Sequence, residues 1–227
     1  MFFDAVAHDL RAPLRSIQNF SRLLEDRTAG QLDAPARDHL RRIQLAADRM
    51  DGLLRGLGEL SQATTAEFRS GPVDLGMLCE WVLAELQDTN PEREAHVATA
   101  GLEDLQVEGD ERLLRLALVR VLDNAWRFTP AEEPVRLDVR GTSGDGWARL
   151  VIRDQGSGFD MRYAHKLFEP FQRLHGPEEG AGHGLGLAVA QRVAARHGGR
   201  IRAESTGGTG ATFELELPTA GGESGTP

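Results

Sequence analysis

The sequence has a single cysteine, Cys79, among its 227 residues, which excludes an internal disulfide and a thiolate metal cluster. No apolar run approaches the ~20 residues of a membrane-spanning helix, and Met1–Asp4 shows no basic start of a signal peptide. Lysine and arginine total 26 against 35 aspartate and glutamate, and this net charge of −9 argues against a nucleic-acid groove. We therefore expect a cytoplasmic protein, with no membrane segment in this chain and no nucleic acid as a partner.

Hydrophobic residues make up 40% of the chain, which is enough for packed cores, and the length allows two domains. The first domain is predicted to be helical. Apolar residues recur every three or four positions from Phe2 to about Asp26 and continue past Pro13, so we expect one helix that includes the proline. After a turn at Thr28–Gln31, Asp33 is expected to cap a second helix that runs to about Ala66.

The second helix carries an apolar seam with alternating spacings of three and four, which is typical of a coiled coil. An antiparallel hairpin of two such helices cannot bury its apolar stripe alone, so we expect a homodimer held by a four-helix bundle. Three glycines, Gly52, Gly56 and Gly58, leave two interpretations open: close helix packing, or a hinge to the next domain. The seam consists of Leu40, Ile43, Ala47, Met50, Leu54 and Leu57.

A break at Ser70-Gly71-Pro72 predicts a domain boundary, and mixed helices and strands follow it. Asp74 is expected to cap a helix through Leu86, and Asp110 a helix that reaches Asn124. The expected fold class is α+β: residues 1–70 form the helical hairpin, and residues 71–218 form a two-layer α/β sandwich with helices on one face of a mostly antiparallel sheet. Residues 219–227 are expected to be a disordered tail. Strands are expected at 95–99, 105–107, 135–140, 147–153, 200–205 and 212–217.

Two glycine clusters point most directly to chemistry. Asp154-Gln155-Gly156-Ser157-Gly158 closes a predicted strand, and Gly182-His183-Gly184-Leu185-Gly186-Leu187 opens a predicted helix. Glycine lets a backbone approach a ligand closely, and a helix N-terminus presents free N–H groups to an anion. Each cluster alone is also compatible with an ordinary turn. As a pair they predict a nucleotide site.

A third segment, at the end of the predicted helix before residue 130, fits the same chemistry. Asn124 and Arg127 are three residues apart and so share a helix face. An amide oxygen can ligate Mg²⁺, and a guanidinium can hold a phosphate. The alternative is a solvated polar edge, which is common for either residue by itself.

In their order along the chain, these segments resemble the boxes of sensor histidine kinases. The resemblance extends from Phe3 to about Pro218, and its first part is closest to phytochrome-type kinases. It implies a dimerisation and histidine-phosphotransfer hairpin followed by an ATP-binding domain of the histidine kinase, chaperone and gyrase type. The matching segments are the H box at Phe3–Leu14, the N box at Asn124–Thr129, the G1 box at Asp154–Gly158, the F box at Phe168–Phe171 and the G2 box at Gly182–Leu187.

The resemblance implies an ATP-dependent protein histidine kinase that autophosphorylates His8 and passes the phosphoryl group to an aspartate of a response-regulator receiver domain. It gives Asp9 the role of the base that orients His8. Arg173, in a predicted lid over 173–181, either approaches the γ-phosphate or is a solvated lid residue. The implied cofactors are ATP and Mg²⁺, with Asn124 as the metal ligand. The implied nucleotide-binding residues are Asn124, Arg127, Phe128, Asp154, Gly156, Gly158, Gly182, Gly184 and Gly186.

Two other functions remain open. One is a degenerate kinase that acts as a dimeric ATP-binding scaffold, against which the presence of His8, Asn124 and Asp154 argues. The other is an ATP-driven conformational machine, which needs a water-activating carboxylate where this chain has Arg120. Because only seven residues precede His8, we also expect an upstream sensor domain that this chain lacks.

Overall fold

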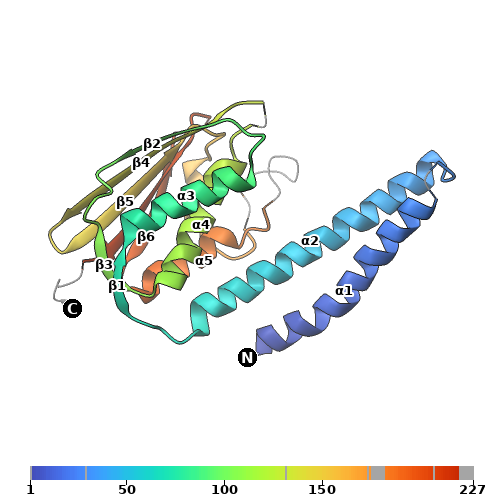
Figure 1. The fold of residues 1–227 in the computed structure, drawn as a ribbon, viewed down its shortest axis with the longest axis horizontal. Helices are drawn as coiled ribbons and strands as arrows, with labels where there is room; N and C mark the ends of the chain where they lie inside the picture. Colours follow the sequence, from blue (N-terminus) through green and yellow to red (C-terminus); the bar gives the residue numbers. More distant parts are fainter. Residues whose placement is uncertain are drawn as a thin grey trace. The chain divides into compact units, whose positions relative to one another are not determined.

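The computed structural model describes residues 2–28, 30–130, 132–172, 174, 182–206 and 208–219, and leaves out the side chains of residues 2–6 and 8. The chain divides into two compact units, Met1–Gln62 and Ala63–Pro227 (Figure 1). Within the described ranges, no helix combines the length and the apolar character that a membrane crossing requires.

The first unit is a hairpin of two long helices, α1 at Phe2–Arg27 and α2 at Ala34–Thr65 (Figure 1). Helix α1 includes Pro13, as the apolar period predicted. The cap of α2 is also confirmed, because Asp33 Oδ1 accepts the Ala36 N–H at 2.9 Å.

The apolar seam of this hairpin divides into two stripes with a period of seven. One stripe is buried between α1 and α2, and the residues three positions further along each helix are about half exposed, at 43–49%. Since one stripe already packs inside the hairpin, the second remains open on a single chain. The buried stripe is Ala7, Leu14, Ser21, Leu40, Ala47 and Leu54; the open stripe is Leu10, Ile17, Leu24, Ile43 and Met50.

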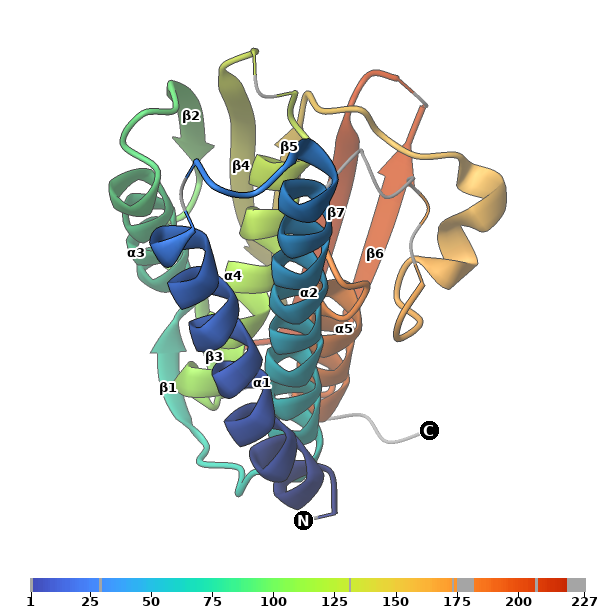
Figure 2. The same ribbon diagram turned by 90° about the vertical axis from the view of Figure 1, so that its right-hand side faces the viewer.

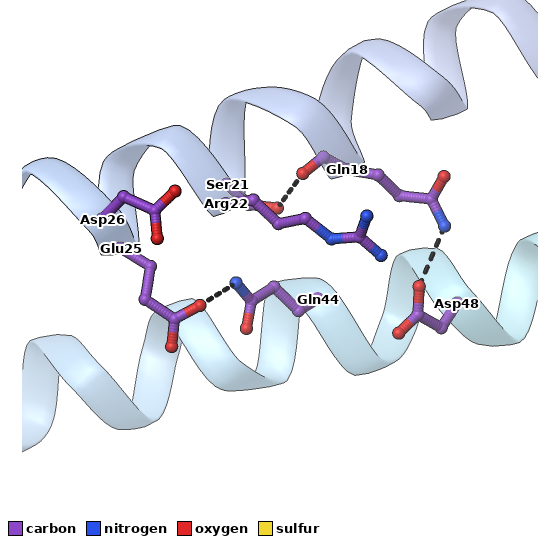
Figure 3. Close-up of a pocket in the computed structure, with 7 residues that line it drawn as sticks. All are labelled: Gln18, Ser21, Arg22, Glu25, Asp26, Gln44 and Asp48. Carbon is purple, nitrogen blue, oxygen red and sulfur yellow. Dashed lines mark hydrogen bonds between the residues drawn. The ribbon is translucent and has the colours of Figure 1, made fainter.

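Toward its turn, the hairpin is also joined by polar pairs between α1 and α2 (Figure 3). Gln18 Nε2 donates to Asp48 Oδ1 at 2.9 Å, and Gln44 Nε2 donates to Glu25 Oε2 at 2.8 Å. These side chains line a pocket between α1 and α2. Such pairs match only in one alignment of the helices, so they favour this register.

The second unit is the predicted two-layer sandwich. Helices α3 (Leu75–Thr89), α4 (Glu111–Arg127) and α5 (Gly186–Arg196) cover one face of a five-stranded sheet (Figures 1 and 2). The strand order is β2-β4-β5-β7-β6, in which only the β2–β4 pair is parallel, so the expected mostly antiparallel sheet is confirmed. The strands are β2 (Ala95–Ala100), β4 (Val135–Gly144), β5 (Trp147–Asp154), β6 (Arg200–Ser205) and β7 (Ala211–Pro218).

The opposite face of the sheet carries charged side chains in cross-strand pairs. Glu216 on β7 is buried between Arg149 on β5 and Arg200 on β6. The hydrogen bond from Arg200, followed by that from Arg149, outweighs the effect of burial and lowers the Glu216 pKa to about 2.

Three local elements differ from the expectations. Gly71–Asp74, expected as a boundary and a cap, forms strand β1, which pairs with β3 (Gln106–Gly109) outside the main sheet. Met161–Lys166 forms a 3₁₀ helix, η1, that the sequence did not suggest. The caps themselves are confirmed, because Asp74 accepts the Met77 N–H and Asp110 accepts those of Arg112 and Leu113.

The end of α2 and the segment after it are attached to the second unit. Arg196 donates to the carbonyls of Ala63 and Ala66 at 3.2 and 2.7 Å, and its guanidinium lies 5.4 Å from the centre of the Phe68 ring. Neither interpretation of the α2 glycines is decided, because a Cβ at Gly58 would lie 3.4 Å from Arg11 Nη2, the mobile end of a long side chain. The hinge stays a prediction, and the expected tail at 220–227 lies outside the described residues.

Candidate functional site

The site is centred on Asp154, the last residue of β5, whose side chain is only 3% exposed. Its Oδ1 accepts the N–H groups of Gly156 at 2.9 Å and Ala211 at 3.0 Å. Burial raises the pKa of this carboxyl group, and the two backbone hydrogen bonds oppose the rise. One carboxylate oxygen therefore joins the end of β5, the glycine turn after it and the start of β7.

The other oxygen of Asp154 remains available for a ligand, because no donor among the described residues hydrogen-bonds to Oδ2. An available carboxylate oxygen on a residue that is otherwise buried suits a partner that brings an N–H group. The surrounding backbone is too close for side chains: a Cβ at Gly210 would lie 2.1 Å from the Asp154 carbonyl oxygen, and one at Gly156 would lie 2.5 Å from that of Phe128.

The end of α4 lies against this turn. The Ser157 N–H donates to the Phe128 carbonyl at 3.0 Å, which brings the predicted N and G1 boxes together. Asn124 is partly exposed, and no described group hydrogen-bonds to its side-chain amide. Arg127 instead pairs with Asp123 one turn earlier, at 2.9 Å from Nε.

The backbone of the second glycine cluster, residues 182–187, packs against Phe171 and Gln172. Phe171 has a φ of 65° and donates its N–H to the Gly184 carbonyl at 2.7 Å. Gly184 has a φ of 70°, and a Cβ there would lie 2.5 Å from the Gln172 carbonyl oxygen, so only glycine fits. Gly182, by contrast, has open space around its backbone.

Helix α5 begins directly after this cluster with an open N-terminus. Its cap residue, Leu185, makes no side-chain capping bond, so the cap side chain does not satisfy the first N–H groups of the helix. Helices α4 and α5 pack side by side in both views (Figures 1 and 2). An anion at this helix start would therefore lie beside the polar face of α4.

The structure brings most of the predicted nucleotide residues together, in the second unit. Asn124, Arg127 and Phe128 lie at the end of α4, next to the turn from Asp154 to Gly158, and Gly184 and Gly186 lie where α5 meets α4. His8 and Asp9 belong to α1 in the first unit, and the side chain of His8 is outside the described part. Arg173 and 175–181, the predicted lid, are outside the described residues as well.

One residue that holds this site, Arg93 in the loop before β2, could not be identified from the sequence. Its Nη1 donates to the Trp126 carbonyl at 2.8 Å, and its Nη2 to those of Thr129 and Pro130 at 2.5 and 3.0 Å. These carbonyls belong to the turn that carries Phe128. An isolated arginine in a polar loop shows no period or motif, so only the folded chain reveals its role.

The site fits a magnesium–nucleotide complex. Over the described residues, no group of three or more His, Cys, Asp or Glu side chains forms a protein-built metal site. Mg²⁺ bound with nucleotides needs few protein ligands, because phosphates and waters supply the rest. The partly exposed Asn124 amide suits that role, and Asp154 Oδ2 suits the exocyclic amine of adenine.

Comparisons with known protein families match both units. Residues 109–221 match the family described as histidine kinase-, DNA gyrase B-, and HSP90-like ATPase, and residues 1–66 match the His Kinase A (phospho-acceptor) domain.

Curated relatives match nearly the whole chain. Cyanobacterial phytochrome A of Nostoc sp. is 30% identical over 98% of this chain and 29% of its own length. The signal transduction histidine-protein kinase AtoS of Escherichia coli is 30% identical over 94% of this chain and 34% of its own length. The chain therefore spans about a third of the length of these relatives.

Solved structures share the architecture. Full-length ShkA in complex with AMPPNP aligns with a TM-score of 0.70 at 27% identity, over 96% of this chain and 46% of that one. The mycobacterial sensor histidine kinase MprB aligns with a TM-score of 0.55 at 32% identity, over 66% of this chain and 97% of that one.

The contacts of Arg93 predict an effect on nucleotide affinity. Replacing Arg93 with alanine removes charge-assisted bonds to three carbonyls and frees the turn that carries Phe128. We expect ADP to bind about tenfold more weakly by titration calorimetry, with partial recovery in Arg93→Lys. Arg140→Ala, which removes an ion pair with Asp138 on the charged sheet face, is the control and should bind ADP normally. Equal affinities for Arg93→Ala and Arg140→Ala would contradict this role.

Proposed function

Because the chain belongs to the sensor histidine kinase family, we propose that it uses ATP to phosphorylate its own His8 and passes the phosphoryl group to an aspartate of a response regulator. The observation that carries the proposal is the arrangement along α4: its C-terminal end lies against the turn after the buried carboxylate of Asp154, and Arg120 on the same helix lies against the start of α5 at Gly186. His8 supplies the acceptor on α1.

In the proposed nucleotide complex, Asp154 Oδ2 accepts the adenine amine and Phe128 packs beside the base. Asn124 ligates Mg²⁺, which neutralises charge on the phosphates when it is bound. Arg127 exchanges its contact with Asp123 for a phosphate oxygen. The backbone of Gly156 and Gly158 shapes the turn at the base, and the G2 glycines Gly182, Gly184 and Gly186 present amides to the phosphates at the start of α5.

The transfer step joins one ring nitrogen of His8 to the γ-phosphorus and breaks the bond from that phosphorus to the β,γ-bridging oxygen, so ADP leaves. An imidazole with a reference pKa of ~6.5 is largely neutral at pH 7 and can attack. Asp9 accepts a hydrogen bond from the other ring nitrogen and offsets the positive charge that develops there. Arg173 stabilises charge on the transferred group. The phosphohistidine then transfers its phosphoryl group to an aspartate of the response regulator.

Two substitutions separate the acceptor from the nucleotide site. We expect both His8→Ala and Asn124→Ala to abolish labelling by γ-³²P-ATP, measured as acid-labile, base-stable phosphate. His8→Ala should keep the ATP affinity of the unmodified chain, because it removes only the acceptor. Asn124→Ala should lose magnesium-dependent affinity, measured by titration calorimetry. Normal labelling of His8→Ala would refute the acceptor assignment.

The open stripe of the hairpin supports the proposed homodimer. Its members repeat every seven residues on both helices, at 10, 17 and 24 and at 43 and 50, so they form a continuous apolar surface. Pairing two hairpins along this surface gives a four-helix bundle and removes the exposed apolar area from water.

Replacing Ile17 with glutamate tests that dimer. The change places a charge on the open stripe without altering the buried stripe inside the hairpin, so we expect folded monomer by light scattering and circular dichroism. Leu45→Glu is the matched control, because Leu45 is 57% exposed and lies off the stripe, and it should stay dimeric. Monomeric unmodified chain at micromolar concentration would overturn the proposal.

The wider setting follows from the relatives. The chain spans about a third of proteins named as phytochromes and sensor kinases, which supports an upstream sensor domain that signals through α1. The need for ATP and the lone buried Cys79 support a cytoplasmic location. Nothing in the site favours the degenerate scaffold or the ATP-driven machine.

A further inference from the structure

Arg120 lies on the same face of α4 as the proposed ligands of the nucleotide. It precedes Asn124 by four residues and Arg127 by seven, which places the three side chains along one side of the helix. The Arg120 side chain is 26% exposed, and its Nη1 lies 3.9 Å from Asp123 Oδ2. Asp123 also pairs with Arg127, so it lies between two arginines.

The stem of Arg120 runs along the first residue of α5. A Cβ built on Gly186 would lie 3.4 Å from Arg120 Cδ and 3.8 Å from Arg120 Cβ. Gly186 follows Leu185, the cap residue that makes no side-chain capping bond. A guanidinium group is thus held next to the positive end of a helix dipole, and two positive groups this close favour an anion between them.

The charges on this part of α4 strengthen the case. Arg120 and Arg127 each carry a positive charge on the face of α4 near the start of α5, on either side of Asp123. An arginine binds phosphate oxygens through paired N–H groups.

We propose that Arg120 is a phosphate-binding residue of the nucleotide site and that it supplies part of the neutralisation otherwise left to Mg²⁺. The inference rests on the proposed placement of the phosphates at the start of α5. Its consequence is selective: Arg120 strengthens binding of nucleotides with two or three phosphates, and it does so most when magnesium is scarce.

Titration calorimetry of the full chain with ADP and with AMP, each with excess Mg²⁺ and with EDTA, tests this role. Replacing Arg120 with asparagine should weaken ADP binding in EDTA by about tenfold or more, and by less with Mg²⁺. AMP binding should change by less than about twofold, because AMP lacks the outer phosphates. Arg115→Asn is the matched control on the same helix, since Arg115 pairs with Glu85 on α3, and it should bind like the unmodified chain.

Each other result has a definite meaning. If Arg120→Asn binds ADP as well as the unmodified chain in EDTA, the inference is wrong and the nucleotide site stands. If ADP and AMP affinities fall by the same factor, Arg120 only supports the packing of α4 against α5, and the phosphate-binding role is again refuted. If the folded unmodified chain binds no ADP at all, both this inference and the proposed nucleotide site fail.

Discussion

The proposed nucleotide site depends on the buried carboxylate of Asp154. Its Oδ1 accepts two backbone N–H groups, from Gly156 and Ala211, and this fixes the turn after β5 against the start of β7. Burying a carboxylate is costly unless its oxygens are hydrogen-bonded, and among the described residues only Oδ1 receives such bonds. Oδ2 can therefore accept a hydrogen bond from a ligand that carries an N–H group.

The other parts of the site follow from that turn. Ser157 donates a hydrogen bond to the Phe128 carbonyl, and Arg93 donates to the carbonyls of Trp126 and Thr129 on either side of it. These bonds restrain the end of α4, which carries Asn124. Phe171 fixes Gly184 in a conformation that only glycine adopts comfortably, so α5 begins beside α4. The backbone of three distant segments therefore builds the cradle, and few side chains are needed to complete it.

The sequence predicted the features that depend on neighbouring residues. The period of the apolar residues located α1, and the caps at Asp33, Asp74 and Asp110 were predicted correctly because capping involves only the next three residues. The glycine clusters indicated the site because they mark where the backbone has no room for side chains. Contacts between distant segments could not be predicted this way. Strand β1 forms only because β3 lies beside it, Arg93 acts only where its loop meets α4, and Leu40 is buried while Ile43 is open because of where α1 packs.

Selectivity for the base tests the account most directly, because it probes the oxygen of Asp154 that the fold leaves for a ligand. Titration calorimetry should compare ADP with inosine diphosphate, which has a carbonyl in place of the adenine amine, so that the group at this position of the base accepts hydrogen bonds and does not donate to Oδ2. The account predicts that ADP binds at least about tenfold more tightly, since the inosine carbonyl would face the Asp154 carboxylate where the adenine amine donates a hydrogen bond to it. Equal affinities for the two nucleotides in the folded chain would contradict it.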